Sequence, residues 1–189
     1  MGAPVPRIAI CVVTYCSAPL IEDLVASLRE GARATEWTLV FADNSSTDDT
    51  TAVIRRYAPF ATLVETGANL GYAGGVNAAI RAAGPQDAYL ILNADVRLHP
   101  GCAAALFAQL SPTVGVVVPQ LRDARGKLIW SMRRTPTVVR AWADALIGAE
   151  RAGRHDRLGE VVTDAELYRS GRVTDWAEGS TQLIGRQCA

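Results

Sequence analysis

Short apolar runs rich in β-branched residues alternate with segments of helical period as far as residue 119. The pattern predicts five strands, at 8–13, 37–42, 60–65, 88–93 and 114–118. It predicts helices between and after the first four strands, with apolar faces in 20–28, 53–57, 77–83 and 101–110. Strands that alternate with helices are typical of a parallel sheet with right-handed crossovers, so the sequence predicts an α/β fold.

The rhythm changes beyond Pro119. Residues 128–132 are compatible with a strand, and 137–149 have the apolar spacing of a helix. Residues 150–172 are rich in charge and carry no strong apolar period. A long irregular segment of this kind is typical of a lid or binding loop, and a solvated connector without a role is the alternative that stays open.

Composition narrows the class of protein. The chain has 189 residues, 49% of them hydrophobic, which is enough for a core of one domain. Lys plus Arg and Asp plus Glu both number 19, so the net charge of the chain favours binding neither to nucleic acid nor to an anionic membrane. The four cysteines lack the C-x-x-C spacing of metal or redox sites. We find no leader sequence or membrane-spanning run and expect a cytoplasmic protein, with peripheral membrane contact left open.

Two predicted strands end in a carboxylate. Asp43 follows 37–42, and Asp95 follows 88–93, with Asn93 on the same face as Asp95 in an extended segment. Ligands of open α/β sheets bind outside the carboxyl ends of the strands, and Mg²⁺ needs only one or two protein carboxylates when a diphosphate supplies further oxygens. For Asp43, capping of the following segment is the competing interpretation.

A glycine-rich segment, 69–77, precedes the helix predicted at 77–83. Its glycines would let the backbone approach a ligand, and a helix N-terminus favours phosphate. The segment matches neither the phosphate-loop pattern nor G-x-G-x-x-G, and the first strand-to-helix turn, 14–18, contains no glycine, which disfavours dinucleotide oxidoreductases. A tight turn without a ligand is the alternative interpretation.

Five segments together resemble the family 2 glycosyltransferases of GT-A fold, in particular the rhamnosyltransferase-like branch that uses dTDP-sugars. They are 12–15 (VVTY), 43–48 (DNSSTD), 69–77 (NLGYAGGVN), 92–95 (LNAD) and 175–180 (DWAEGS). The resemblance implies a three-layer α/β/α sandwich with a mostly parallel central sheet. It implies one domain, 1–189, with a nucleotide-sugar-binding half at 8–119 and an incomplete acceptor half at 120–189.

The resemblance also implies roles for residues. Those that would bind the nucleotide-sugar are Thr14, Tyr15, Asp43, Gly71, Gly74, Asn77 and Asn93. Asp95 would hold Mg²⁺ or Mn²⁺. The residues that would face the donor sugar and the acceptor are Trp176, Gly179 and Ser180.

Two departures from the family pattern affect the expected chemistry. Cys16 stands where the family usually has Asn after Thr-Tyr. The resemblance places the family's catalytic base beyond the position of Ala189, and Asp175 and Glu178 are the nearby carboxylates that remain as candidates. Since general-base catalysis contributes about 10²–10⁴-fold, we expect donor binding with feeble transfer.

The function expected from the resemblance is inverting, metal-dependent transfer of a rhamnose-like sugar from a dTDP- or UDP-sugar to a glycan or polyprenyl-linked acceptor. Two alternatives remain: a non-catalytic nucleotide-sugar-binding fragment, and a sugar-phosphate nucleotidyltransferase, which the glycine-free turn at 14–18 disfavours. We also expect Leu183 and Ile184 to be partly uncovered, which would favour self-association.

Overall fold

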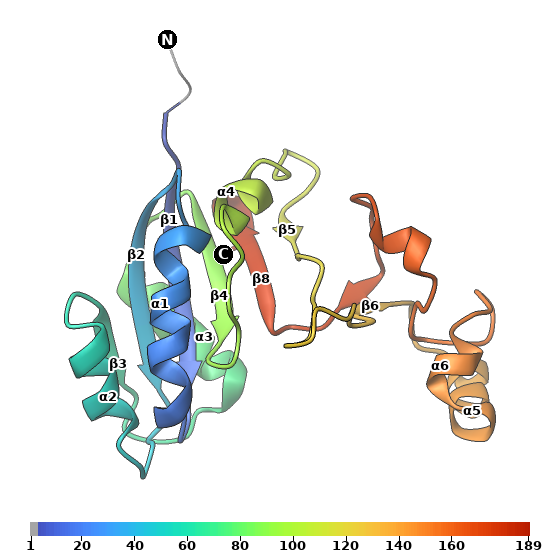
Figure 1. Cartoon of the computed structure of the whole chain (residues 1–189), viewed down its shortest axis with the longest axis horizontal. Coiled ribbons are helices and arrows are strands. Elements are labelled where there is room, and N and C mark those ends of the chain that lie inside the picture. Colours follow the sequence, from blue (N-terminus) through green and yellow to red (C-terminus); the bar gives the residue numbers. More distant parts are fainter. Residues whose placement is uncertain (1–3) are drawn as a thin grey trace. The chain divides into compact units, whose positions relative to one another are not determined.

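The computed structural model describes residues 4–189, which form two compact units (Figure 1). The first unit contains residues 4–119 together with 180–189, and the second contains 120–179. The chain therefore leaves the first unit after Pro119 and returns to it at Ser180.

The first unit is built on a six-stranded sheet of order β3-β2-β1-β4-β8-β5. Its strands are β1 Arg7–Thr14, β2 Glu36–Asp43, β3 Thr62–Glu65, β4 Ala88–Asn93, β5 Val116–Val117 and β8 Thr181–Gly185. The first four strands of the chain pair in parallel, and β8 runs antiparallel to both β4 and β5. The predicted α/β fold with a mostly parallel sheet is confirmed.

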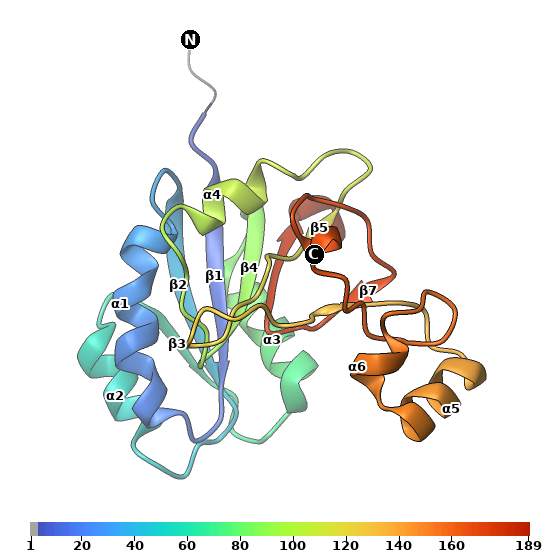
Figure 2. The same cartoon turned by 45° about the vertical axis from the view of Figure 1, so that its right-hand side comes forward.

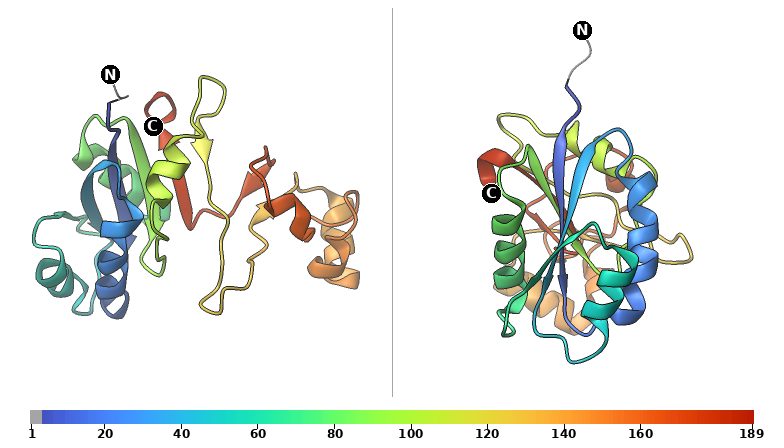
Figure 3. Two further views of the ribbon diagram at one scale, coloured as in Figure 1. Left: turned by 45° about the horizontal axis from the view of Figure 1, so that its top comes forward. Right: turned by 90° about the vertical axis from the view of Figure 1, so that its left-hand side faces the viewer.

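Helices cover both faces of this sheet (Figure 3). Helices α1 (Ile21–Gly31), α2 (Thr50–Tyr57) and α4 (Cys102–Phe107) share a core with one face of β1 and β4, and α3 (Gly71–Ala83) packs on the other face. Alternate residues of β1 enter the two cores, Ile8 and Ile10 into the first and Ala9 and Cys11 into the second. This alternation follows from the period of two of a strand that is buried on both sides.

Strand β8 corrects the expectation for the end of the chain. Leu183 is fully buried, and it pairs with Leu90 of β4 and Val117 of β5, while Ile184 is half-buried on the opposite face. The prediction that Leu183 is left uncovered is wrong, because 181–185 form an inner strand of the sheet rather than a frayed end.

Helix α3 begins at Gly71, six residues before the predicted start at Asn77. The glycines at 74 and 75 therefore lie inside the helix. A Cβ built on Gly75 would lie 2.7 Å from Cγ1 of Val13 on β1, so this glycine permits the close approach of helix and sheet. Gly71 has a φ of +72°, which explains glycine at the first position of the helix.

The second unit holds the two-stranded pair β6 (Met132–Arg133) and β7 (Trp176–Ala177), with helices α5 (Val138–Ile147) and α6 (Ala149–Ala152) beside each other (Figure 2). The predicted helix at 137–149 is confirmed, with the Thr137 hydroxyl accepting from the Arg140 N–H. The strand predicted at 128–132 is found at β6, which begins at Met132, the last residue of the predicted range. The remaining short 3₁₀ turns of the chain are Ala18–Leu20, Ala165–Tyr168 and Arg186–Cys188.

Arg134 makes several of the contacts that hold the charge-rich segment 150–172. The Arg134 guanidinium donates to the carbonyl oxygens of Gly159 and Val161 at 3.0 and 3.2 Å and pairs with the Asp156 carboxylate at 2.7 Å. Within residues 4–189, every helix is too short or too polar to cross a membrane.

Candidate functional site

Polar side chains end three adjacent parallel strands in register. Thr14 on β1 pairs with Asp43 on β2, and Val13 pairs with Asn93 on β4. Thr14, Asp43 and Asn93 therefore lie along one carboxyl edge of the sheet, as their sequence positions predict. Asp95 follows Asn93 two residues later at the same edge.

Asp43 is a buried acceptor of three hydrogen bonds. Its Oδ1 accepts from the hydroxyls of Thr14, at 2.8 Å, and Ser46, and its Oδ2 accepts from the Ser46 N–H at 2.9 Å. The side chain is 2% exposed. Because α2 begins only at Thr50, Asp43 holds the loop that follows β2 rather than capping a helix directly.

Asp95 has the opposite character. It is exposed, and no side chain or backbone group within residues 4–189 forms a hydrogen bond or ion pair with its carboxylate. The neighbouring Asn93 is half-buried, and its N–H donates to the Ser180 carbonyl at 2.9 Å. The described residues contain no group of three or more His, Cys, Asp or Glu side chains placed to hold a metal.

The Asp95 carboxylate and the Asn93 side-chain amide fit a hard divalent cation whose remaining ligands come from a bound substrate. Mg²⁺ in phosphate-transfer sites uses one or two carboxylates, with substrate phosphates and water completing the shell. A single free carboxylate beside a side-chain amide matches that requirement, whereas a site that binds a metal by protein ligands alone would need more.

A network that sequence reasoning missed joins the start of α3 to this edge. The Asn44 side chain donates from Nδ2 to the Gly71 carbonyl at 2.9 Å, and the Thr66 hydroxyl donates to the Asp43 carbonyl at 2.8 Å. Asn44 is 3% exposed, so its amide is part of the interior. The run of polar residues after β2 indicated that this loop could form hydrogen bonds. Which groups the loop contacts depends on a turn in which Ser45 has a φ of +62°.

Other residues predicted for the nucleotide site lie around the same edge or along α3. Tyr15 is 55% exposed, and Cys16 has a φ of +49°, with its N–H donating to the Ser46 hydroxyl at 2.9 Å. Asn77 is exposed in the second turn of α3, about 200° around the helix from the sheet-facing Gly75. The early start of α3 thus moves Asn77 away from the turn in which it was expected.

The two candidate bases belong to the second unit, and both are engaged. The Asp175 carboxylate accepts from the backbone N–H of Thr135 at 2.6 Å and from its hydroxyl at 2.9 Å, and these bonds lower the pKa of Asp175. Glu178 is paired with the Arg133 guanidinium. A carboxylate with a lowered pKa is a weaker proton acceptor, which disfavours Asp175 as a general base. The carboxylate of Glu178 is occupied by its ion pair with Arg133.

Trp176 and Gly179 also belong to the second unit, whereas Ser180 begins the segment that returns to the first. The Trp176 indole N–H donates to the Arg134 carbonyl at 3.1 Å, and its ring lies 5.9 Å from the Arg133 guanidinium carbon. The indole therefore has partners within its own unit.

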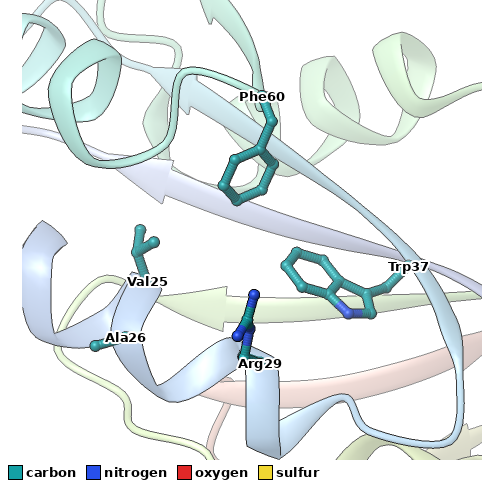
Figure 4. A pocket seen from close by; sticks show the side chains of 5 residues that line it. All are labelled: Val25, Ala26, Arg29, Trp37 and Phe60. Carbon is teal, nitrogen blue, oxygen red and sulfur yellow. The ribbon is translucent and has the colours of Figure 1, made fainter.

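A separate shallow cavity of about 550 Å³ lies beside α1 and β2 (Figure 4). Val25, Ala26 and Arg29 of α1 form one wall, and Trp37 and Phe60 meet edge to face at 5.9 Å on the other. Trp37 lies near the amino end of β2, so the cavity is remote from the carboxyl edge that carries Asp43.

Comparison with known proteins identifies relatives of this chain. The family described as glycosyl transferase family 2 matches residues 9–168. The chain is 34% identical over 196 aligned positions to the N-acetylglucosaminyl-diphospho-decaprenol L-rhamnosyltransferase of Mycobacterium tuberculosis, in two strains. The alignment covers 92% of this chain and 60% of that protein, so the chain spans about three fifths of the length of these relatives.

Solved structures agree on the fold. The mannosyltransferase PcManGT from Pyrobaculum calidifontis, in complex with GDP-Man and Mn²⁺, is 32% identical with a TM-score of 0.55, over 65% of this chain and 37% of that one. The glucosyl-3-phosphoglycerate synthase of Mycobacterium tuberculosis is 17% identical with a TM-score of 0.56, over 96% of this chain and 57% of that one. These neighbours are GT-A glycosyltransferases.

Proposed function

Since the chain belongs to glycosyltransferase family 2, we propose that the carboxyl edge of its sheet binds a nucleoside-diphosphate sugar together with a divalent cation. The observation that carries this proposal is the free, exposed carboxylate of Asp95 beside Asn93, at the end of the strand adjacent to the Thr14–Asp43 pair. Bound Mg²⁺ or Mn²⁺ would neutralise charge on the diphosphate leaving group. The Mn²⁺ and GDP-Man in the PcManGT complex support this choice.

The buried network at the strand ends gives the nucleotide site its shape. Thr14 and Ser46 fix the Asp43 carboxylate, whose Oδ2 retains a lone pair for the N–H of a pyrimidine base. The exposed ring of Tyr15 offers a face for the base, and Asn93 offers an amide for a ribose hydroxyl. We extend the site to Gly71, Gly74 and Asn77 of α3 as predictions from the family pattern.

The sugar and acceptor are proposed from the mycobacterial relatives. Their name describes transfer of L-rhamnose to an N-acetylglucosaminyl-diphospho-decaprenol. We propose a rhamnose-like donor carried by dTDP or UDP and a polyprenyl-linked acceptor, handled at the cytoplasmic surface of a membrane. Trp176, Gly179 and Ser180 are proposed to face the donor sugar and acceptor.

Inverting transfer requires a group that takes the proton of the acceptor hydroxyl. Asp175 and Glu178 are both held by partners in the second unit, and we propose neither as that group. The same observation favours a second candidate function for this chain, which is binding of nucleotide-sugar without transfer.

Calorimetry with UDP and dTDP tests the donor site. With Mn²⁺ or Mg²⁺ present, we expect Asp95→Ala to weaken nucleotide affinity by at least about tenfold, because it removes a metal ligand. Its thermal midpoint should not change, since the side chain has no partner to lose. Glu30→Ala, at the far end of α1, is the matched exposed control. Equal affinity with metal and with chelator would refute the metal role.

A turnover assay separates the two candidates. Wild-type chain is incubated with dTDP-rhamnose and a polyprenyl-diphosphate N-acetylglucosamine acceptor, and the glycolipid product is measured. Multiple turnover that depends on Asp95 supports transfer. Metal-dependent binding with no product supports the binding function, and neither binding nor product refutes both.

A further inference from the structure

Helix α5 turns its polar residues inward and its apolar residues to solvent. Arg140 and Asp144, one turn apart, are partly buried. Arg140 donates to the carbonyl oxygens of Thr135 and Asp156, and Asp144 accepts from the Glu160 N–H at 3.4 Å. This is the reverse of a helix that packs its apolar stripe on a protein core.

The outward side, which we term the α5 face, consists of Val138, Val139, Trp142 and Leu146. These side chains are between 61% and 75% exposed, and α5 contains no fully buried residue. Their spacing of one, four and eight residues from Val138 places them along one stripe of the helix. Contiguous exposed apolar side chains of this kind mark an interaction surface.

Cationic side chains follow directly after this helix. Arg151, Arg154 and Arg157 are exposed, and none of the three guanidinium groups forms a hydrogen bond or ion pair within residues 4–189. They lie on or after α6, which packs beside α5 (Figure 2). Of the acids between 148 and 158, Asp156 is already paired with Arg134, which leaves Glu150 as the opposing charge.

We propose that the α5 face docks on an anionic lipid surface, with Arg151, Arg154 and Arg157 contacting the headgroups. A helix of high amphipathicity with Trp and Leu on one side lies in the plane of the interface, and its binding strengthens with nearby cations and anionic lipid. Trp142 suits that boundary because its ring is apolar and its indole N–H is polar.

The size of the α5 face favours lipid over a second copy of the chain. A standard protein interface uses about 20–30 residues a side, and this face offers four side chains from one ten-residue helix. Only the location at a membrane is taken from the proposed function. The α5 face is the surface of the chain that would contact that membrane.

Vesicle co-sedimentation tests the docking surface, with the full chain and vesicles of phosphatidylcholine with or without phosphatidylglycerol. Leu146→Glu should lower the partition coefficient for anionic vesicles by at least about tenfold, because an exposed leucine that would enter the lipid interface is replaced by a charge. Val173→Glu is the control, since Val173 is 91% exposed in the same unit but lies outside the α5 face. It should change binding less than twofold.

A second variant tests the charge. Replacing Arg151, Arg154 and Arg157 together by Gln should weaken binding to anionic vesicles by about tenfold or more and leave binding to neutral vesicles unchanged. Far-ultraviolet circular dichroism confirms that each variant is folded.

Failure has distinct signatures. A folded wild-type chain that does not sediment with anionic vesicles overturns the inference, as does a Leu146→Glu variant that sediments equally well. A dimer in light scattering that Leu146→Glu converts to monomer, without vesicle binding, assigns the face to a second copy instead. Nucleotide affinity, measured without lipid, should be the same in Leu146→Glu and wild type, so this result is independent of the donor site.

Discussion

The Thr14 hydroxyl donates to Oδ1 of Asp43 across the β1–β2 pair at 2.8 Å, and both side chains are buried. The bond joins the ends of two parallel strands at the point where the candidate site begins. Asp43 therefore organises the loop that follows β2, at the sheet edge where we propose that the nucleotide binds.

Replacement of Asp43 by Asn should cost stability as well as nucleotide affinity. The amide keeps one acceptor oxygen and places an NH₂ group where Thr14 and Ser46 donate, so we expect a loss of about 2–3 kcal/mol in the free energy of unfolding, measured in urea. Thr14→Ser keeps the hydroxyl donor and should lose only about 1 kcal/mol. An unchanged urea midpoint for Asp43→Asn would contradict the structural role.

Gly75→Ala should push α3 away from the sheet. Its Cβ would lie 2.7 Å from Val13 Cγ1 and 3.2 Å from Asn44 Nδ2, and overpacking of this kind costs about 1–3 kcal/mol. We expect nucleotide affinity to fall with stability, because Asn44 ties α3 to the sheet edge. Gly171→Ala, with no atom within 4 Å of the new Cβ, is the control and should stay within about 0.5 kcal/mol.

The cysteines should separate by reactivity. Burial raises the pKa of the Cys11 thiol to about 12, so a thiol reagent at pH 8 should modify exposed Cys16 and Cys188 quickly and Cys11 only after unfolding. The rate of the fast phase should be unchanged in Cys11→Ser. Because the folded-state pKa lies above the ordinary value of 9.0, this thiol favours folding below pH 9, and that contribution is lost as the pH rises toward 12.

Leu183→Ala should show that the returning segment belongs to the core. The side chain is fully buried between β4 and β5, and truncation of such a leucine costs about 2–5 kcal/mol. Val116→Ala on β5, where the side chain is 50% exposed, should cost clearly less. Equal urea midpoints for the two variants would argue against an inner position for β8.

The parallel strands of the core could be predicted from the sequence because each strand has its own local apolar pattern. The run predicted at 88–93 is β4, and the run predicted at 8–13 lies within β1, since a strand buried on both faces has a continuous apolar pattern. Strand β8 was missed because its five residues mix polar and apolar side chains. Its partner β4 is remote in the sequence, so no local pattern reports the pairing.

At the candidate site, residue positions were predictable and contacts were not. Asp43 and Asn93 end β2 and β4, the two strands that flank β1, and Asp95 follows Asn93 at the same edge. The bonds of Asn44 and Ser46 depend on a loop with positive φ at Ser45, which is rare for a residue other than glycine. The binding roles of these residues stay predictions until a ligand is bound.

The position of β8 also sets an order of events during synthesis. β5 pairs only with β8 in the sheet, and β8 is translated after the whole of 120–179. Until then β4 presents an open edge, and unpaired strand edges promote aggregation in folding intermediates. We expect a ribosome-bound chain stalled before Thr181 to engage holding chaperones, and to release them once 181–185 have emerged from the exit tunnel.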